Sequence, residues 1–466
     1  MRRLLLATAA AISMTGAAIN LTGAARADTR FEARLVGQAI LPAATFLAPP
    51  ADAPEYFRIS GRFTGAGNPR NEQPGSFPGV TLPGYGPRAT GLAMPFPGQP
   101  LQGFSGIKPI GDGSYWVTGD NGFGNRRNSP DALLMIHRVR PDFQSGAVAV
   151  ERTIFLADPN RVAAFPITNE ATPTRYLTGA DFDVESIQPL PDGTMMLGDE
   201  FGPYLLHFDA QGRLLRVIET TLEGAALRSP DHHAQVIPAN PTAGVPHRVR
   251  RSGGYEGMAM TPDGRTLWAM LEQPIFAAGT NQAEGAFLRV LEFDVGSMAW
   301  TGRNIRYRLE PGAAAIGDFN MIDERRALVI ERDNGEGDPG RACAAGVEST
   351  HAAPCFAMPA RFKRVYLVDL GAVDAEGFAR KIGHIDLMAI QDPERIARQR
   401  GDRAADAADT VFSFPFFTIE NVAMVDADHI IIGNDNNLPF SAGRHLSRAD
   451  DNELVLLHVP ELLRAR

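Results

Sequence analysis

The sequence predicts an all-β protein and, within that class, a β-propeller. Five segments repeat the same order of a short apolar run, a turn rich in Gly and Asp, and a second short apolar run, which is the pattern of a β-hairpin. No long stretch has the periodicity of a helix. Variable inserts separate the hairpins, and repeated hairpins of this kind indicate the blades of a propeller.

The five segments share an anchor near their start, a turn in the middle and polar residues at their end. In chain order they read FSGIKPIGDGSYWVTGDNG, VESIQPLPDGTMMLGDEFG, YEGMAMTPDGRTLWAMLEQP, GDFNMIDERRALVIERDNG and IENVAMVDADHIIIGNDNN. Their anchors are Ser105, Glu185, Glu256, Asp318 and Glu420. Neighbouring anchors lie farther apart than the roughly 40 to 50 residues of a compact blade. The sequence therefore predicts long loops between the blades.

The expected number of blades is about six, with five and seven as alternatives. The N-terminal run FEARLVGQAIL is expected to pair with the C-terminal run ELVLLHV, which would complete a further blade. This pairing would close the ring and remove its open sheet edges.

Acidic residues recur at both ends of the predicted hairpins. An acid follows about fifteen residues after four of the anchors, a spacing that would place it opposite the anchor. Facing carboxylates repel, so a repeated arrangement of this kind indicates that one rim binds a cation. The alternative is that each acid accepts backbone N–H bonds from a neighbouring loop. The four pairs are Glu185 with Glu200, Glu256 with Glu272, Asp318 with Asp333, and Glu420 with Asp435.

An Asp-Asn pair follows three of the apolar runs, at Asp120-Asn121, Asp333-Asn334 and Asp435-Asn436. The pair offers an anionic oxygen and a neutral amide oxygen, which are ligands that hard cations such as calcium prefer. The alternative is an Asn/Gly turn that only ends a strand.

The ends and the composition of the chain predict its location. Residues 1–27 have a basic tip, an apolar stretch and an Ala25-Arg26-Ala27 ending, which match a signal peptide. Arg2-Arg3 leaves twin-arginine export as an alternative to the ordinary route. We expect one domain over residues 28–466, in the periplasm or secreted. The formal net charge of −9 disfavours nucleic acid as a partner, and no later apolar run is long enough to span a membrane.

Cys343 and Cys355 are the two cysteines of the chain and lie in a polar stretch. In an oxidising compartment such a pair is expected to form a disulfide that closes a surface loop.

Taken together, the motifs FSGI, GDNGFGNRRNSPDALLMIHRV, DVESIQPLPDGTMMLGDEFGP, YEGMAMTPDG, VIERDNG and TIENVAMVDADHIIIGNDNN resemble the phytase-like domain family described as "esterase-like activity of phytase". The similarity runs from about Phe104 to Val459. It implies a propeller hydrolase related in outline to calcium-dependent propeller phytases. Ser105 departs from the acidic pattern of the other anchors. The resemblance implies a metal-binding role for Asp120, Glu185, Asp199, Glu200, Glu256, Glu272, Glu331, Asp333, Glu420 and Asp435.

The expected function is calcium-dependent hydrolysis of a small phosphoric ester. No nucleophilic triad can be identified, because Ser105 does not lie in a G-x-S-x-G elbow. Arginines beside the rim motifs are candidates to hold phosphate oxygens. Two alternatives remain, a carboxylic-ester or lactone hydrolase and a calcium-stabilised binding propeller without catalysis. The candidates for catalysis are Glu185, Glu200, Glu256, Arg126, Arg127 and Arg332.

Overall fold

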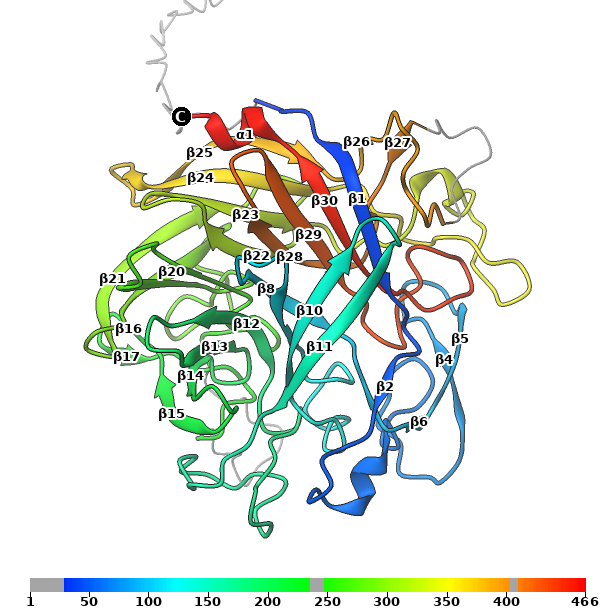
Figure 1. Ribbon diagram of the computed structural model, residues 1–466, viewed down its shortest axis with the longest axis horizontal. Helices are drawn as coiled ribbons and strands as arrows, with labels where there is room; N and C mark the ends of the chain where they lie inside the picture. Colours follow the sequence, from blue (N-terminus) through cyan, green and yellow to red (C-terminus); the bar gives the residue numbers. More distant parts are fainter. Residues whose placement is uncertain (1–28, 235–246, 402–409) are drawn as a thin grey trace, which may run out of the picture.

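The computed structural model describes residues 29–234, 247–401 and 410–466, and the predicted signal peptide, residues 1–27, lies outside them. In the described residues nearly all regular structure is β-strand (Figure 1). The helices there are α1 (Pro460–Arg464) and the short 3-10 turns Glu55–Arg58 and Pro339–Arg341. No described helix has the length and apolar character needed to cross a membrane. The prediction of an all-β protein is confirmed.

Twenty of the strands form five runs of four antiparallel strands in the described residues, here called units; three of them are separate sheets, and the first and the fifth are joined by a parallel strand pair within one ten-stranded sheet. The first contains β8 (Phe104–Pro109), β9 (Tyr115–Gly119), β10 (Met135–Asp142) and β11 (Ala147–Phe155). The second contains β12 (Val184–Pro189), β13 (Met195–Asp199), β14 (Tyr204–Phe208) and β15 (Leu214–Glu219). The third contains β18 (Gly257–Met260), β19 (Thr266–Met270), β20 (Phe287–Asp294) and β21 (Ala299–Arg308). The fourth contains β22 (Ala315–Met321), β23 (Arg326–Arg332), β24 (Lys363–Val373) and β25 (Ala379–Asp386). The fifth contains β28 (Thr418–Met424), β29 (His429–Asp435), β30 (Asn452–His458) and β1 (Arg34–Leu41).

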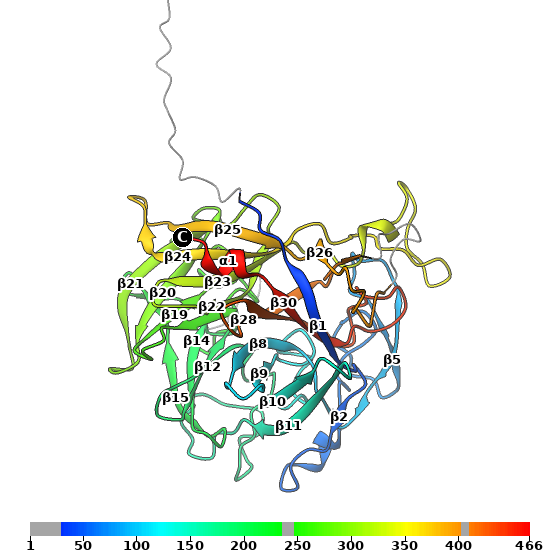
Figure 2. The same ribbon diagram turned by 45° about the horizontal axis from the view of Figure 1, so that its top comes forward.

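The first strands of the five units surround one centre. β8 contacts β12, β12 contacts β18, β18 contacts β22, β22 contacts β28, and β28 contacts β8 again. Figure 2 shows β8, β12, β22 and β28 near the middle, with β11, β15, β21 and β25 farther out. The arrangement is propeller-like. The expected count of six blades is not confirmed, since the described residues form five such units.

Apolar side chains fill the space between neighbouring units. Successive residues of a strand point to opposite faces, and both faces can be buried: Val329 and Ile330 of β23 lie in different layers of the core. Many of these residues are Val, Ile, Leu and Phe, which suit a pleated, buried surface. Each layer of the core draws residues from two adjacent units, so the units cannot bury their apolar faces separately. Examples of residues that share a layer are Ile136 with Leu197, Leu205 with Leu267, Val290 with Val329, Ile330 with Ile432, and Ile431 with Val117.

The two ends of the described chain meet in the fifth unit. β1 pairs antiparallel with β30, from Arg34 opposite His458 to Leu41 opposite Asn452 (Figure 1). Buried Gln38 donates a hydrogen bond to Glu453 over 2.8 Å. The predicted pairing of FEARLVGQAIL with ELVLLHV is therefore confirmed. It extends the sheet of β28 and β29 and does not form a separate sixth unit.

Four of the five anchors lie at β-bulges. The register of the first hairpin shifts between Val184 and Ser186 in the second unit, and between Ile419 and Asn421 in the fifth. The first and fourth units have similar shifts. A bulge leaves one residue unpaired and turns its side chain away from the normal alternation. The expectation that each anchor lies directly opposite its paired acid is therefore wrong: Asp435 faces Thr418, and Asp199 faces Val184.

The predicted long loops contain short strand pairs. Between β1 and β8 these are β2 (Phe46–Leu47) with β7 (Gln99–Pro100), β3 (Ile59–Ser60) with β6 (Phe96–Pro97), and β4 (Phe77–Val80) with β5 (Ala89–Met94). Elsewhere β16 (Thr221–Leu222) pairs with β17 (Ala225–Ala226), and β26 (Ile390–Gln391) pairs with β27 (Val411–Phe412). Arg88, fully buried before β5, pairs with Glu336 and donates to the Ala442 carbonyl over 2.7 Å. This contact fixes the first long loop on the ring.

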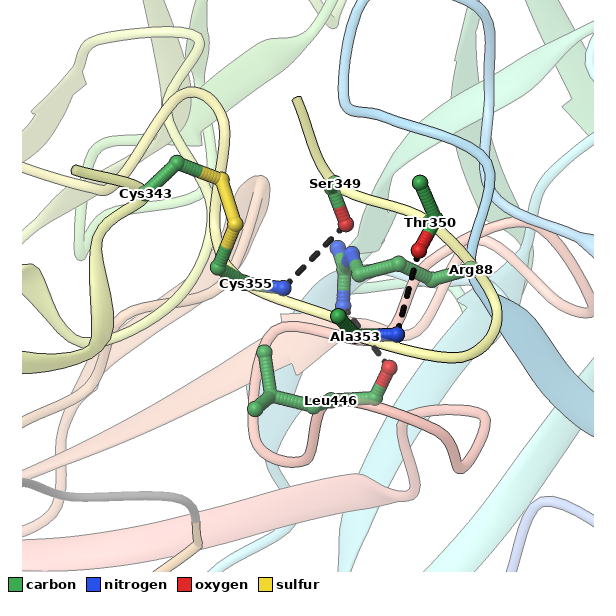
Figure 3. Close-up of a disulfide and its surroundings, with 7 residues drawn as sticks. All are labelled: Arg88, Cys343, Ser349, Thr350, Ala353, Cys355 and Leu446. Atoms are coloured by element: carbon green, nitrogen blue, oxygen red, sulfur yellow. Dashed lines mark hydrogen bonds between the residues drawn. A yellow bond between two sulfur atoms is a disulfide. The ribbon is translucent and has the colours of Figure 1, made fainter. Parts of the chain in front are cut away.

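The disulfide between Cys343 and Cys355 closes a surface loop, as predicted (Figure 3). Inside this loop the Cys355 N–H donates to the Ser349 hydroxyl over 3.2 Å. The disulfide loop packs against the first long loop, which carries Arg88. The guanidinium carbon of Arg88 lies 4.8 Å from the centre of the ring of Phe356, the residue after Cys355.

Candidate functional site

Rim acids from four of the five units converge on one cavity of about 310 Å³. The cavity lies at the edge of the ring where the first strand of each unit begins and the second strand ends. The first, second, third and fifth units contribute carboxylates. The fourth unit contributes Arg332, at the end of β23. The carboxylates that line the cavity are Asp120, Asp183, Glu185, Glu200, Glu256, Glu272, Glu420 and Asp435.

Three of these acids form a compact ligand set. Asp183, Glu185 and Glu200 each offer one oxygen, and these oxygens lie within 4.8 Å of one another. Asn121 orients Asp183 by donating its backbone N–H over 3.1 Å and its side-chain amide over 2.7 Å. Asp199 supports the same turn, because its carboxylate accepts the N–H groups of Asp183 and Gly202.

Two carboxylate oxygens at this cavity lack a hydrogen-bond partner within the described residues. They are Oε1 of Glu200 and Oε1 of Glu256, in side chains that are 4% and 3% exposed. Buried polar atoms are normally hydrogen-bonded, because loss of water without a replacement partner is costly. An unpartnered buried carboxylate oxygen is therefore an acceptor that a ligand can satisfy.

The carboxylates also disturb one another's protonation. Burial and then the neighbouring acids raise the pKa of Glu185, Glu200, Glu256 and Glu420 well above its ordinary value. Burial is the main cause that raises the pKa of Asp435 to about 6. Close carboxylates need either protons or a counter-cation to reduce this repulsion.

The donor set fits a hard cation. The described residues around the cavity supply carboxylate, amide and hydroxyl oxygens, and neither His nor Cys is among them. Calcium and magnesium prefer such oxygens, whereas zinc and copper sites usually include nitrogen or sulfur. With the unpartnered oxygens of Glu200 and Glu256, this donor chemistry is consistent with a calcium-type ion.

Arg332 is the one basic side chain among the described residues that line the cavity. Its Nη2 donates to Glu272 over 2.7 Å and lies 3.7 Å from Glu420. Its Nη1 donates to the Asn334 side chain over 3.1 Å. The Nε is buried and has no partner in the described residues. The Nε–H is therefore a donor that no described residue satisfies.

Three acids with an expected metal role do not line the cavity. Asp199 supports the Asp183 turn. Glu331 accepts from the Tyr307 hydroxyl over 2.6 Å and pairs with Lys381. Asp333 accepts the N–H groups of Arg361 and Phe362 and pairs with Lys363 at 3.0 Å. These carboxylates hold loops and strands in place, so we do not include them in the ligand set. The predicted residues that do line the cavity are Asp120, Asn121, Glu185, Glu200, Glu256, Glu272, Arg332, Glu420 and Asp435.

Arg126 and Arg127 lie in a separate hollow beside the cavity. The guanidinium of Arg126 is already bonded to the carbonyls of Ala180 and Asp231 and to the His233 ring. It therefore ties loops together and has little left for a substrate.

Asp183 is the ligand-set member that the sequence prediction missed. It lies two residues before Glu185 in the motif DVES and just ahead of β12. Both acids lie at or just before the start of the same strand, and their carboxylates reach the same rim. This spacing could have identified Asp183 once Glu185 was placed at the rim.

The fold and the site together define a class: an all-β, propeller-like protein with a buried acidic centre suited to a hard cation. Within that class the chain belongs to the phytase-like family described as "Esterase-like activity of phytase", whose model matches residues 99–438. The resemblance seen in the motifs is confirmed.

Individual relatives are distant. An "Uncharacterized secreted protein" of Arthroderma benhamiae is 26% identical over 128 residues, and the match covers 24% of each chain. Among solved structures, the periplasmic gluconolactonase PpgL of Pseudomonas aeruginosa has a TM-score of 0.32 at 13% identity, covering 83% of this chain and 99% of that one. The arabinanase Arb43A of Bacillus subtilis has a TM-score of 0.33 at 11% identity, covering 76% and 93%. At such TM-scores neither likeness bears on the reaction.

Proposed function

We propose that this protein is a calcium-dependent hydrolase of ester bonds and that the acidic cavity is its active site. The observation that carries the proposal is the ligand set Asp183, Glu185 and Glu200, with an unpartnered buried oxygen on Glu200. Membership in the phytase-like family supports hydrolysis as the class of reaction. When bound there, the ion would supply Lewis-acid chemistry by drawing electron density from an ester oxygen.

The side chains of the cavity have separate roles in this proposal. Glu256 has an unpartnered carboxylate oxygen, so we assign it as the base that accepts a proton from the attacking water. The proton would return to the leaving alcohol. Arg332 would donate its free Nε–H to an anionic oxygen of the substrate. Asn121 would keep Asp183 oriented toward the ion.

Phosphoric esters are the first candidate substrates, because the family resemblance favours them and Arg332 can hold a phosphoryl oxygen. Carboxylic esters or lactones are the second candidate. The observation that favours the second is the charge of the cavity, where eight carboxylates face one guanidinium. A neutral carbonyl substrate would meet less repulsion there.

The test is an assay of the purified protein with aryl phosphates, phytate, aryl acetates and lactones, each with calcium and with excess chelator. We expect ester cleavage that chelator abolishes and calcium restores. Cleavage that persists in chelator would contradict metal dependence. If calcium stabilises the protein while no ester is cleaved, the protein is a calcium-binding propeller without catalysis.

We also propose that the five four-stranded units are the blades of a five-bladed propeller, that residues 28–466 form one domain, and that the protein works in the periplasm or outside the cell. The disulfide and the secreted relative from Arthroderma benhamiae support this location.

A further inference from the structure

The charges around the cavity restrict which ester can bind, and this restriction rests on the proposed function. A substrate with several phosphate groups needs several positive charges to hold them, from basic side chains or from bound cations. Arg332 is the sole basic side chain among the described lining residues, against eight carboxylates. Two divalent ions would still leave the fully ionised cavity anionic.

Arg332 carries one positive charge, so it can balance one anionic group. Two of its nitrogens are engaged, one with Glu272 and one with Asn334, and its Nε has no partner in the described residues. The side chain is 4% exposed, so the contact with Glu272 fixes its position. Its guanidinium carbon also lies 5.5 Å from the centre of the Phe417 ring, on the wall of the cavity.

Two nearby basic side chains are held by other contacts and do not line the cavity. Lys363 donates to the carbonyls of Asp333 and Phe417 and pairs with the Asp333 carboxylate at 3.0 Å. Arg126 is bonded through each of its guanidinium nitrogens in the adjacent hollow, which Arg127 also lines. Neither Lys363 nor Arg126 adds its charge to the wall of the cavity.

The remaining wall is uncharged. Amide side chains, including Asn68, Asn437 and Gln273, alternate with the apolar groups of Leu82, Phe417 and Phe440. Amides can bond to hydroxyl or carbonyl groups, and aromatic faces pack against apolar parts of a ligand. Such a wall matches the uncharged body of a substrate.

We infer that the cavity accepts esters that carry at most one anionic group, held by Arg332, on an otherwise uncharged body, and that it rejects polyphosphorylated substrates such as phytate. The substrate can be a phosphoric monoester or a carboxylic ester, but not a polyanion. Repulsion between like charges at a binding site strongly weakens the binding of a ligand with the wrong charge.

The first test compares substrates on the unmodified protein at a fixed free calcium concentration. One series uses the nitrophenyl esters of acetate, succinate and propane-1,2,3-tricarboxylate, which carry zero, one and two free carboxylates. We expect kcat/KM for the tricarboxylate ester to be at least about a hundredfold below that of the succinate ester. We expect the same order for phytate relative to nitrophenyl phosphate. Equal rates for the polyanion and the monoanion would overturn the inference.

The second test uses Arg332→Gln, with Arg265→Gln as the control because Arg265 is 83% exposed in a hairpin turn. The readout is the ratio of kcat/KM for the succinate ester to that for the acetate ester. We expect Arg332→Gln to lower this ratio at least about tenfold, the loss of roughly one charge-assisted hydrogen bond. Misfolding or loss of calcium would lower both rates and leave the ratio unchanged. An unchanged ratio in a folded, active Arg332→Gln protein would refute the role of Arg332.

A binding measurement separates this inference from the proposed function. Calorimetric titration with unreactive analogues, methyl phosphonate and propane-1,2,3-tricarboxylate, reports selection by charge without any hydrolysis. We expect the monoanion to bind and the polyanion not to bind. If this pattern is found and no ester is cleaved, only the hydrolase proposal fails. Tight binding of the polyanion, with hydrolysis intact, would contradict only the inference that the substrate carries at most one anionic group.

Discussion

At the scale of single residues, the cavity contains carboxylates that the protein alone does not satisfy. Glu200 and Glu256 are buried, lie among other acids, and each has one oxygen without a partner in the described residues. Such residues lower the stability of the folded protein unless protons or a cation offset their charge. They are therefore the best places to ask whether a cation is the missing partner.

Neutralising one of these acids distinguishes the two explanations. If Glu200 binds calcium, Glu200→Gln should weaken calcium binding at least about tenfold, which removes about 1.4 kcal/mol of the stabilisation by calcium. If no ion binds, the same change relieves repulsion, and the variant should be as stable as the parent or more stable. Melting temperatures with calcium and with chelator measure this difference. Glu256 lies outside the ligand set, so Glu256→Gln should weaken calcium binding less than Glu200→Gln does.

The matched control is Glu376→Gln, since Glu376 is 74% exposed and lies in a turn away from the cavity. Glu376→Gln should change the free energy of unfolding by no more than about half a kcal/mol. A gain in stability for Glu200→Gln, with an unchanged response to calcium, would rule out the metal site.

The raised pKa values predict how stability depends on pH in chelator. Between about pH 4 and pH 6 or above, Asp435 and the neighbouring glutamates hold more protons in the folded protein than in the unfolded chain. The free energy of unfolding should therefore fall as pH rises through this range, by at least about 1 kcal/mol. Urea denaturation at a series of pH values measures it. With calcium the fall should be smaller or reversed, because ionised carboxylates bind the ion. A rise in stability over this range in chelator would contradict the electrostatic description.

At the scale of elements, the hairpins were predictable and their bulges were not. Short apolar runs around Gly/Asp turns identify strands from local sequence alone. A bulge depends on how the strand packs against neighbouring units, which local sequence does not report. The prediction therefore found Glu185, Glu200, Glu256, Glu420 and Asp435 at the rim, but gave the wrong facing pairs. It also grouped Glu331 and Asp333 with them, because repeated spacing cannot show that these acids bond to Lys381 and Lys363.

The disulfide loop provides a prediction for a single element. Cys343 and Cys355 are twelve residues apart, and closing a loop of this size restricts the unfolded chain. Replacing both by Ser should lower the free energy of unfolding by about 2 to 3 kcal/mol. Urea denaturation of the oxidised parent and of the double variant measures the change. The parent in reductant should match the variant, and non-reducing peptide mapping should recover the cross-linked peptide. Two free thiols in protein from its native compartment would contradict the pairing.

At the scale of the whole molecule, β1 and β30 form a seam where the two ends of the described chain meet, and we expect a buried ion pair to stabilise it. Arg444 is bidentate to Glu453 on β30, both bonds at 2.8 Å, and Gln38 of β1 donates to the same carboxylate. Removing one partner of a buried pair leaves an uncompensated charge. Arg444→Met should therefore destabilise the protein by about 3 to 5 kcal/mol, and Arg444→Met with Glu453→Leu should recover part of that loss.

The control for the seam is Arg303→Met, which breaks an ion pair with Glu292 in which Arg303 is 55% exposed. That change should cost less than about 1 kcal/mol. Urea denaturation compares the variants. Equal losses for Arg444→Met and Arg303→Met would show that the seam pair does not contribute to stability as inferred.

The seam also sets an order of events during synthesis. Gln38 leaves the ribosome early, and its partner Glu453 follows 415 residues later. Until then the strand Arg34–Leu41 has no β30 to pair with and exposes an edge that another chain could occupy. The last unit can therefore form only after translation is nearly finished, and contacts this distant in sequence form slowly. A newly made chain would depend on being kept apart from its neighbours for longer than a protein of the same size built from local hairpins alone.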